Sequence, residues 1–166
     1  MRHWILALFV FSIAGCLPTG QSQYDPVDWN SQAPPIPEKP QPTPETHEVP
    51  ATLQALLKLH NEQRELKGRP GFQLDTYLCK YAQNHSDWMA KKNNLKHSDI
   101  GALMGKYSTA GENIAWNQKT EVEVVDAWMN SSGHRANIMN RAFTKVGFGV
   151  AYNSNGEPYW CTCFGG

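Results

Sequence analysis

Apolar side chains recur at helical spacing in two stretches that follow a proline-rich region. Residues 51–67 form the first predicted helix, with Leu53, Leu56 and Leu57 on its inner side. Residues 74–92 form the second, which Asp75 is placed to cap. The apolar stripe of this second helix consists of Leu78, Ala82, His85 and Met89. A histidine on such a stripe is typical of a packed, hydrogen-bonded core residue, and we expect His85 to have that role.

Two further helices are predicted beyond residue 119. Residues 120–130 form one of them, with Thr120 at the capping position. Ser131-Ser132-Gly133 interrupts the pattern, and residues 134–140 form a short helix. His134 therefore lies near a helix N-terminus, where the helix dipole is expected to lower the pKa of its ring.

The end of the chain has the period-two pattern of strands. Residues 145–152 and 157–164 form two predicted strands joined by a turn at Asn155-Gly156. Gly147 and Gly149 share one face of the first strand, where a helix can pack closely, and larger side chains on the other face fill a second layer. The pattern predicts an α+β fold, a three-layer α-β-α sandwich around a small antiparallel sheet.

The stretch between the second and third helices is predicted to be mostly loop. Residues 99–110 contain scattered glycines and predict one short helix. Gly111 then precedes Glu112, and a glycine at that point allows a sharp turn that directs the carboxylate inward. The alternative is that Glu112 only pins neighbouring loops through their N–H groups.

Three side chains suggest chemistry: His97, Glu112 and His134. Two neutral imidazoles and a carboxylate form a ligand set of the zinc type. They could equally form a general acid–base cluster. The three residues are 15 and 22 positions apart, so their spacing alone does not bring them together.

Five short motifs follow one another in the chain: His97-Ser98, residues 111–115, Trp128, residues 131–139 and residues 146–150. Their order and spacing resemble the CAP superfamily, which comprises cysteine-rich secretory, antigen 5 and pathogenesis-related proteins, and especially its short bacterial members. The resemblance covers residues 51–164. It implies the same three-layer sandwich for a domain that extends over residues 51–166.

The resemblance also implies a cleft. In that family two histidines face one cleft together with two acidic residues, and His97, Glu112 and His134 would fill three of these four places. They would bind a divalent metal such as zinc, or act as catalytic residues if the protein is an enzyme. The fourth place, usually a glutamate three residues after Trp128, is Ser131 here. Residues expected to support the cleft are Asn61, Arg64, Asn113, Trp128, Ser131 and Asn137. Of these, Asn61 and Arg64 are expected to tie the first helix to neighbouring backbone.

Residues 1–16 have the features of an export signal. A short apolar run follows Arg2 and ends at Ile13-Ala14-Gly15-Cys16, which resembles a bacterial lipobox. Cys16 is therefore the expected lipidation site, and its acyl chains would anchor the protein in a membrane on the extracytoplasmic side. Leu17 after the cysteine resembles outer-membrane sorting if the host has two membranes. The alternative is a plain secretory signal with an incidental cysteine.

Residues 17–50 are predicted to be a disordered linker. Seven of the 18 residues 33–50 are proline, which favours an extended polyproline conformation. Such a spacer could hold the domain up to roughly 50 Å from the bilayer; a ligand role for the tract is the alternative. The chain has 15 Lys and Arg and 15 Asp and Glu, so its charge gives no reason to expect nucleic acid as a partner, and we expect a monomer.

The remaining cysteines are Cys79, Cys161 and Cys163. Cys161 and Cys163 share one face of the last strand, where a bridge between them would be strained. A disulfide from Cys79 to one of them is expected in an exported chain and would leave one free thiol. A metal site at the Cys-x-Cys pair is the less favoured alternative.

Two classes of function remain open. The first is a surface-tethered binding module whose cleft takes an extended ligand, namely a peptide, glycan or lipid outside the cell or in its wall. The second is a metal-assisted hydrolase, a peptidase or cell-wall hydrolase, that uses His97, Glu112 and His134. The serine at position 131, in place of a second carboxylate, favours binding over turnover.

Overall fold

The computed structural model describes residues 50–166 of the chain. The expected signal segment with its lipidation site Cys16, and the linker up to residue 49, lie outside the described residues. In residues 50–166, no helix is both long and apolar enough to cross a lipid bilayer.

The described residues form helices and strands in nearly the predicted order. The helices are α1 (Ala51–Glu65), α2 (Thr76–Lys92), α3 (Gly101–Met104), α4 (Glu121–Asn130) and α5 (Ser132–Met139). The strands are β1 (Gln73–Leu74), β2 (Ala110–Trp116), β3 (Lys145–Tyr152) and β4 (Pro158–Gly165). The predicted caps are also present: Asp75 accepts hydrogen bonds from two N–H groups of α2, and Thr120 accepts one from Glu123.

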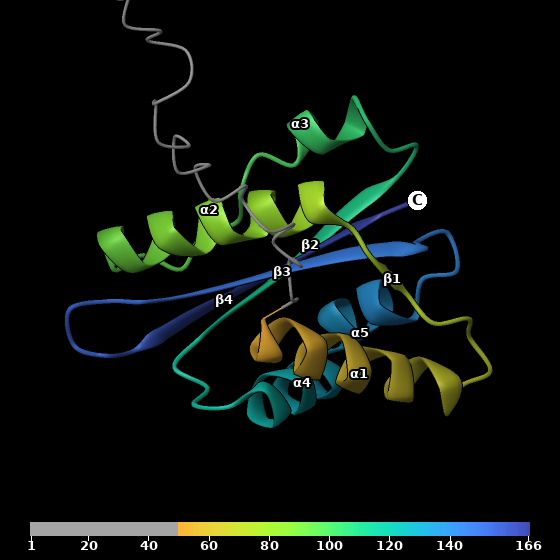
Figure 1. Ribbon diagram of the computed structural model, residues 1–166, viewed down its shortest axis with the longest axis horizontal. Helices are drawn as coiled ribbons and strands as arrows, with labels where there is room; N and C mark the ends of the chain where they lie inside the picture. The colour runs from red at the N-terminus through yellow and green to blue at the C-terminus, as the bar shows by residue number, and fades with distance from the viewer. Residues whose placement is uncertain (1–49) are drawn as a thin grey trace, which may run out of the picture. The chain divides into compact units, whose positions relative to one another are not determined.

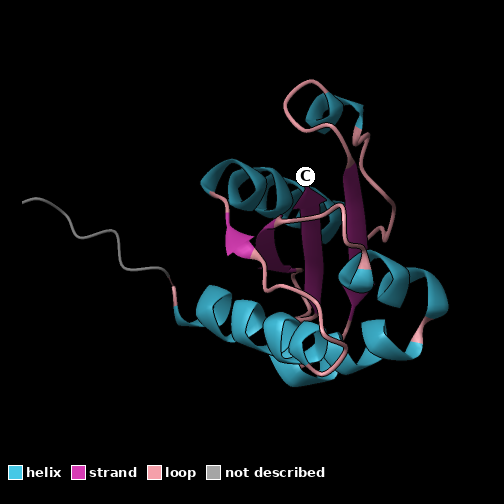
Figure 2. Cartoon of the chain, turned by 90° about the vertical axis from the view of Figure 1, so that its right-hand side faces the viewer, coloured by secondary structure: helices cyan, strands magenta, loops and turns pink. Residues whose placement is uncertain are grey.

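The predicted α+β three-layer sandwich is confirmed. The helix α2 covers one face of the sheet, and α1, α4 and α5 cover the other (Figure 1). A view turned by 90° shows the twisted strands with helices on either side (Figure 2). Apolar residues fill both interfaces. Those on the α1–α4–α5 side include Leu56, Val124, Trp128, Ile138, Phe148 and Phe164, and those on the α2 side include Leu78, Ala82, Met89, Ile114, Cys161 and Cys163.

The sheet differs from the prediction in two ways. Its order is β1-β3-β4-β2, and the two-residue strand β1 pairs parallel to β3, so the sheet is mixed rather than purely antiparallel. The strand β2 occupies residues that the sequence predicted to be loop, and it pairs antiparallel with β4 along its whole length. The central strand β4 is therefore hydrogen-bonded on both edges, and all eight of its residues are buried.

Gly111 lies in β2, where the sequence predicted a sharp turn. Its φ is not positive, so it makes no sharp turn; within residues 50–166 the glycines with positive φ are Gly68 and Gly156. A Cβ atom on Gly111 would instead lie 2.8 Å from the ring of Phe143. The glycine is needed because a ring packs against the strand, and the predicted turn before Glu112 is wrong.

Close packing of α2 on the sheet depends on two glycines of β3, as the sequence predicted. A Cβ atom on Gly147 would lie 2.1 Å from the backbone nitrogen of Cys79, and one on Gly149 would lie 2.4 Å from that of Gln83. These are backbone atoms of a helix, so no side-chain rotation could relieve the overlap.

Asn61 and Arg64 tie α1 to neighbouring backbone, as predicted. The Asn61 amide exchanges two hydrogen bonds with the backbone of Phe72. The buried Arg64 guanidinium donates to the carbonyls of four residues, namely Pro70, Ile138, Asn140 and Phe143. One charged side chain thus holds α1 against the end of α5 and the segment that leads to β3.

His60 is buried on the same helix. Its Nδ1 lies 2.8 Å from the carbonyl oxygen of Leu56, and its ring packs against Phe148 with 4.9 Å between ring centroids. Burial, together with the nearby Arg64 charge, lowers the pKa of His60 to about 4, although the hydrogen bond to Leu56 acts in the opposite direction.

We predict that Gly147→Ala destabilises the fold by about 3 kcal/mol, because the new methyl group must push α2 off the sheet. Gly133→Ala is the matched control: no atom lies within 4 Å of its Cβ position, so the change should stay within about 1 kcal/mol. Urea denaturation gives both free energies of unfolding. Equal values for the two variants would contradict the close approach of helix and strand.

We predict that the lowered pKa of His60 reduces the free energy of unfolding by about 3 kcal/mol as the pH falls from 6.5 to 4. In this window the unfolded chain binds a proton that the folded chain does not accept, so the free energy of unfolding falls as the pH drops, and the loss is complete below about pH 4. Urea denaturation at pH 7 and pH 4 of the wild type and His60→Gln isolates this contribution. The same pH dependence in both proteins would contradict it.

Candidate functional site

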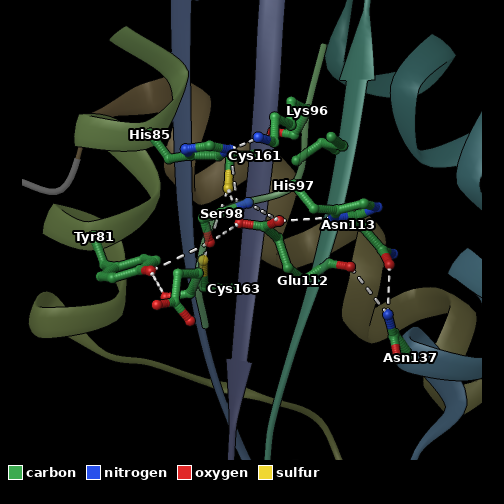
Figure 3. A network of polar contacts seen from close by, with 12 residues as sticks. Tyr81, His85, Lys96, His97, Ser98, Glu112, Asn113, Asn137, Cys161 and Cys163 are labelled. Carbon is green, nitrogen blue, oxygen red and sulfur yellow. Dashed lines mark hydrogen bonds and ion pairs between the residues drawn. The ribbon is translucent and has the colours of Figure 1, made fainter. Parts of the chain in front are cut away.

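The site is built around the buried carboxylate of Glu112 on β2, whose side chain is 2% exposed. Its Oε1 accepts hydrogen bonds from His97 Nδ1 at 2.7 Å and from the backbone N–H of Ser98 at 3.0 Å. Its Oε2 accepts from Ser98 Oγ at 2.6 Å and from the thiol of Cys161 at 3.6 Å (Figure 3). Both oxygens are thus occupied by protein donors, and the segment that follows α2 is fastened to the sheet.

The hydrogen bond to Glu112 fixes the orientation of the His97 ring. The carboxylate accepts this hydrogen bond, so Nδ1 of His97 carries the hydrogen that it donates, and Nε2 is the ring nitrogen that Glu112 does not engage. The side chain of His97 is 61% exposed, in contrast to its partner. The pair is a solvent-accessible imidazole oriented by a buried carboxylate, which suits a metal ligand or a general base.

His134 is the third residue of α5, and two asparagines hold this helix against β2. Asn113 Nδ2 donates to the carbonyl oxygen of His134 at 3.1 Å. Asn137 Nδ2 donates to the carbonyl oxygen of Glu112 at 3.1 Å and to Asn113 Oδ1 at 2.9 Å. The expected supporting role of both asparagines therefore has a structural basis.

The pKa of His134 is lowered, as the sequence predicted, but the reasons differ. Burial is the largest cause, and the positive charge of His97 is the second; the helix dipole is not needed to explain the shift. A protonated His97 ring thus acts electrostatically on His134, but His134 lines neither of the hollows at His97 described below. The ligand atoms of the two histidines and that of Glu112 do not all lie within 4.8 Å of one another.

His85 belongs to the site, which the sequence did not indicate. Its side chain is 11% exposed, and Nε2 lies 2.7 Å from the carbonyl oxygen of Lys96, as expected for a packed, hydrogen-bonded histidine. The same Nε2 is also 4.0 Å from Glu112 Oε2, and the ring stacks on Trp88. Helical spacing correctly placed His85 on the inner face of α2 but could not show what that face meets.

Tyr81, also on α2, is a second residue that the sequence did not single out. Its hydroxyl lies 2.6 Å from the carbonyl oxygen of Asp99 and 3.2 Å from Ser98 Oγ. Burial raises the pKa of Tyr81, which therefore stays a neutral hydrogen-bonding group. Tyr81 and Glu112 together hold Ser98 from two sides.

Two hollows meet at His97 and Ser98. One, of about 260 Å³, is lined by His85, Trp88, Lys96, His97, Ser98 and Asp99. The other, of about 310 Å³, is lined by His97, Ser98, Ile100, Ala110, Gly111, Glu112 and Asn137. A ligand that filled both would pass over the ring of His97.

The last two expected supporting residues lie near α4. Trp128 is 1% exposed and its Nε1 donates to the carbonyl oxygen of Ile114, so it joins α4 to β2 as a core residue. Ser131 lies between α4 and α5, and its side chain caps neither helix. The position where the family usually has a second glutamate thus carries only a hydroxyl group.

The expected disulfide from Cys79 is not formed: Cys79, Cys161 and Cys163 are all free thiols. The Cys79 backbone lies directly against β3 at Gly147. Cys161 and Cys163 instead face each other, with 3.7 Å between their sulfur atoms. The prediction failed because spacing showed a shared strand face but not the position of Cys79 over it.

Comparison with known proteins identifies the family to which this fold belongs. Residues 57–164 match the CAP family, described as the cysteine-rich secretory protein family. The uncharacterized protein YkwD of Bacillus subtilis is 41% identical over 132 residues, which cover 72% of this chain and 50% of YkwD. The chain thus spans about half the length of this relative.

Solved structures show the same fold. An extracellular protein from Bacillus anthracis that contains an SCP domain has a TM-score of 0.58 and 28% identity, over 69% of this chain and 40% of that one. An outer surface protein from Borrelia burgdorferi has a TM-score of 0.61 and 19% identity, over 68% of this chain and 90% of that one. The family match and these similarities lead to one conclusion: the chain belongs to the CAP superfamily and is a member of its bacterial, SCP-domain branch.

Proposed function

We propose that this protein is an extracytoplasmic, lipid-tethered binding module that takes an extended polar ligand across His97. The observation that carries the proposal is the meeting of two hollows at an exposed imidazole whose orientation is fixed by a buried carboxylate. Tethering through Cys16 rests on the lipobox-like end of the apolar N-terminal run. An extracytoplasmic location is supported by the similarity to an extracellular SCP-domain protein.

The lining of the first hollow favours a glycan or peptide over an acyl chain. It combines Trp88, which is 40% exposed, with the charged side chains of Lys96 and Asp99. An exposed indole offers a flat apolar surface on which a sugar ring or a peptide side chain can stack, and the charged groups can hydrogen-bond to the same ligand. An acyl chain would leave these charges without partners.

A divalent metal such as zinc would be held by the two histidines, although the ligand atoms of His97, His134 and Glu112 do not all lie within 4.8 Å of one another. Imidazole nitrogen is a ligand type that zinc accepts; the hydrogen bond to Glu112 leaves Nε2 of His97 available, and burial favours the neutral ring of His134. Glu112 would act from behind His97, because its Oε1 already accepts from His97 Nδ1 and from the Ser98 backbone N–H. A metal held in this way would supply a Lewis acid to the ligand.

A metal-assisted hydrolase is the second candidate function. The observation in its favour is the His97–Glu112 pair, because a carboxylate-oriented neutral imidazole can accept a proton from water. Against it stands Ser131, which supplies no second carboxylate near α5.

We predict that zinc binds to the full chain after treatment with a chelator, and that the affinity falls about 10- to 100-fold in Glu112→Gln, a loss typical of a group that orients a ligand. His97→Ala and His134→Ala should abolish binding. Calorimetry measures these affinities in a Cys161→Ser/Cys163→Ser background, so that the buried cysteine pair cannot contribute. Lys96→Ala is the control and should bind as the parent does. Equal heats in the parent and both histidine variants would exclude the site.

We predict that soluble peptidoglycan fragments bind to the full chain and that Trp88→Ala weakens binding about 2- to 10-fold, the loss of one stacking contact. Trp116→Ala is the matched control, because Trp116 is 43% exposed but lines neither hollow. Fluorescence anisotropy of labelled fragments measures the affinities, and binding to phospholipid vesicles is measured for comparison. Binding to vesicles alone would contradict the polar ligand. Cleavage of the fragments that is lost in His97→Ala would establish the hydrolase instead.

A further inference from the structure

A second group of ligand-type side chains lies behind the site, on the α2 side of the sheet. Cys161 and Cys163 point to the same face of β4, and β2 pairs Glu112 directly opposite Cys163. The sulfur atoms are 3.7 Å apart, and Cys161 Sγ lies 3.6 Å from Glu112 Oε2 (Figure 3). All three residues are buried, and one ligand atom from each lies within 4.8 Å of the other two.

These separations match the edges of a tetrahedral metal site. With metal–sulfur bonds of about 2.3 Å, two sulfur ligands at tetrahedral corners lie about 3.8 Å apart. With a metal–oxygen bond of about 2.1 Å, the sulfur–oxygen edge is about 3.6 Å. The observed 3.7 Å and 3.6 Å therefore require little movement, whereas a Cys161–Cys163 disulfide would need the sulfur atoms to approach to about 2.05 Å within one strand.

We propose that Cys161, Cys163 and Glu112 form a second, buried site for a thiophilic divalent cation such as zinc. This site is separate from the one proposed at His97 and His134, and it uses thiolates rather than imidazoles. It does not depend on the proposed ligand or on any hydrolytic activity.

Replacing the two thiol protons with one divalent cation leaves the net charge of this buried group unchanged. Before binding, the group holds one carboxylate and two neutral thiols, so its net charge is −1 with Glu112 ionised. A divalent cation replaces the two thiol protons, which leave to solvent, and the total for two thiolates, one carboxylate and the cation is again −1. The core therefore gains no net charge, although an isolated ion there would be costly.

The thiol protons also set the direction of the pH dependence. Because each cation displaces two protons, affinity should rise steeply with pH. The cation could enter at Glu112, which borders the hollow of about 310 Å³.

One position of the tetrahedron remains to be filled. His85 Nε2 lies 4.0 Å from Glu112 Oε2. His85 Nε2 is hydrogen-bonded to the carbonyl oxygen of Lys96, so it would have to give up this hydrogen bond to coordinate the cation. A water molecule or a small thiol from solution could fill the position instead.

Cobalt(II) tests the proposal because thiolate-to-cobalt charge transfer absorbs in the near ultraviolet, whereas imidazole ligands give no such band. The full chain, reduced with a phosphine without oxygen, is titrated with cobalt and then with zinc. We expect the band to saturate near one equivalent, to vanish when zinc is added, and to persist in His97→Ala/His134→Ala. No charge-transfer band in the reduced wild type would overturn the proposal.

Cysteine variants locate the sulfur ligands. Cys161→Ser and Cys163→Ser should each lose the band, and Cys79→Ser should keep it, with circular dichroism as the check on folding. A band that Cys79→Ser loses and Cys161→Ser/Cys163→Ser retains would overturn the assignment. If the buried variants fail to fold, X-ray absorption of zinc-loaded His97→Ala/His134→Ala still decides: two sulfur neighbours at about 2.3 Å are expected, and only nitrogen and oxygen neighbours would exclude the site.

Discussion

A single buried carboxylate, that of Glu112, holds the candidate site together. Its four donors are a ring N–H, a backbone N–H, a hydroxyl and a thiol, which come from two separate parts of the chain. Without this acceptor, the donors of Ser98 and Cys161 would be left unpaired in or near the core, which costs about 1–3 kcal/mol for each buried group. The exposed ring of His97 owes its orientation to the same interaction. The site is therefore rigid on its inner side and open on its outer side.

The parts of the fold that could be predicted are those with a one-sided environment. The helices and β3 each present one face to the core or a small-residue face to a helix, so period 3.6 or period two survives in the sequence. The strand β4 is buried on both faces, but the Asn155-Gly156 turn marks where it begins. The strand β2 has no such asymmetry, because five consecutive residues within it are buried. Two of these, Glu112 and Asn113, are polar, so the stretch reads as loop although both side chains are hydrogen-bonded inside the protein.

The candidate site was predicted as far as its motifs allow. Family resemblance selected His97, Glu112 and His134, but it did not reveal that the carboxylate serves the first histidine from behind. The contributions of His85 and Cys161 depend on the register between β2 and β4 and on the seating of α2 over the glycines of β3. Neither could be obtained from sequence spacing once β2 had been assigned to a loop. The missed strand thus accounts for the missed proximity of His85 to Glu112, and the packing of α2 on β3 accounts for the wrong disulfide.

The position of β4 in the chain has a consequence for biosynthesis. This strand is the centre of the sheet, yet it follows every other element, and its partner β2 lies more than 40 residues earlier. Neither β2 nor β3 can complete its ladder until β4 has been synthesised, so the sheet cannot form early during translation. Until β4 has emerged, the helices have no complete sheet to pack against, and a chain in that state suits the export proposed for it.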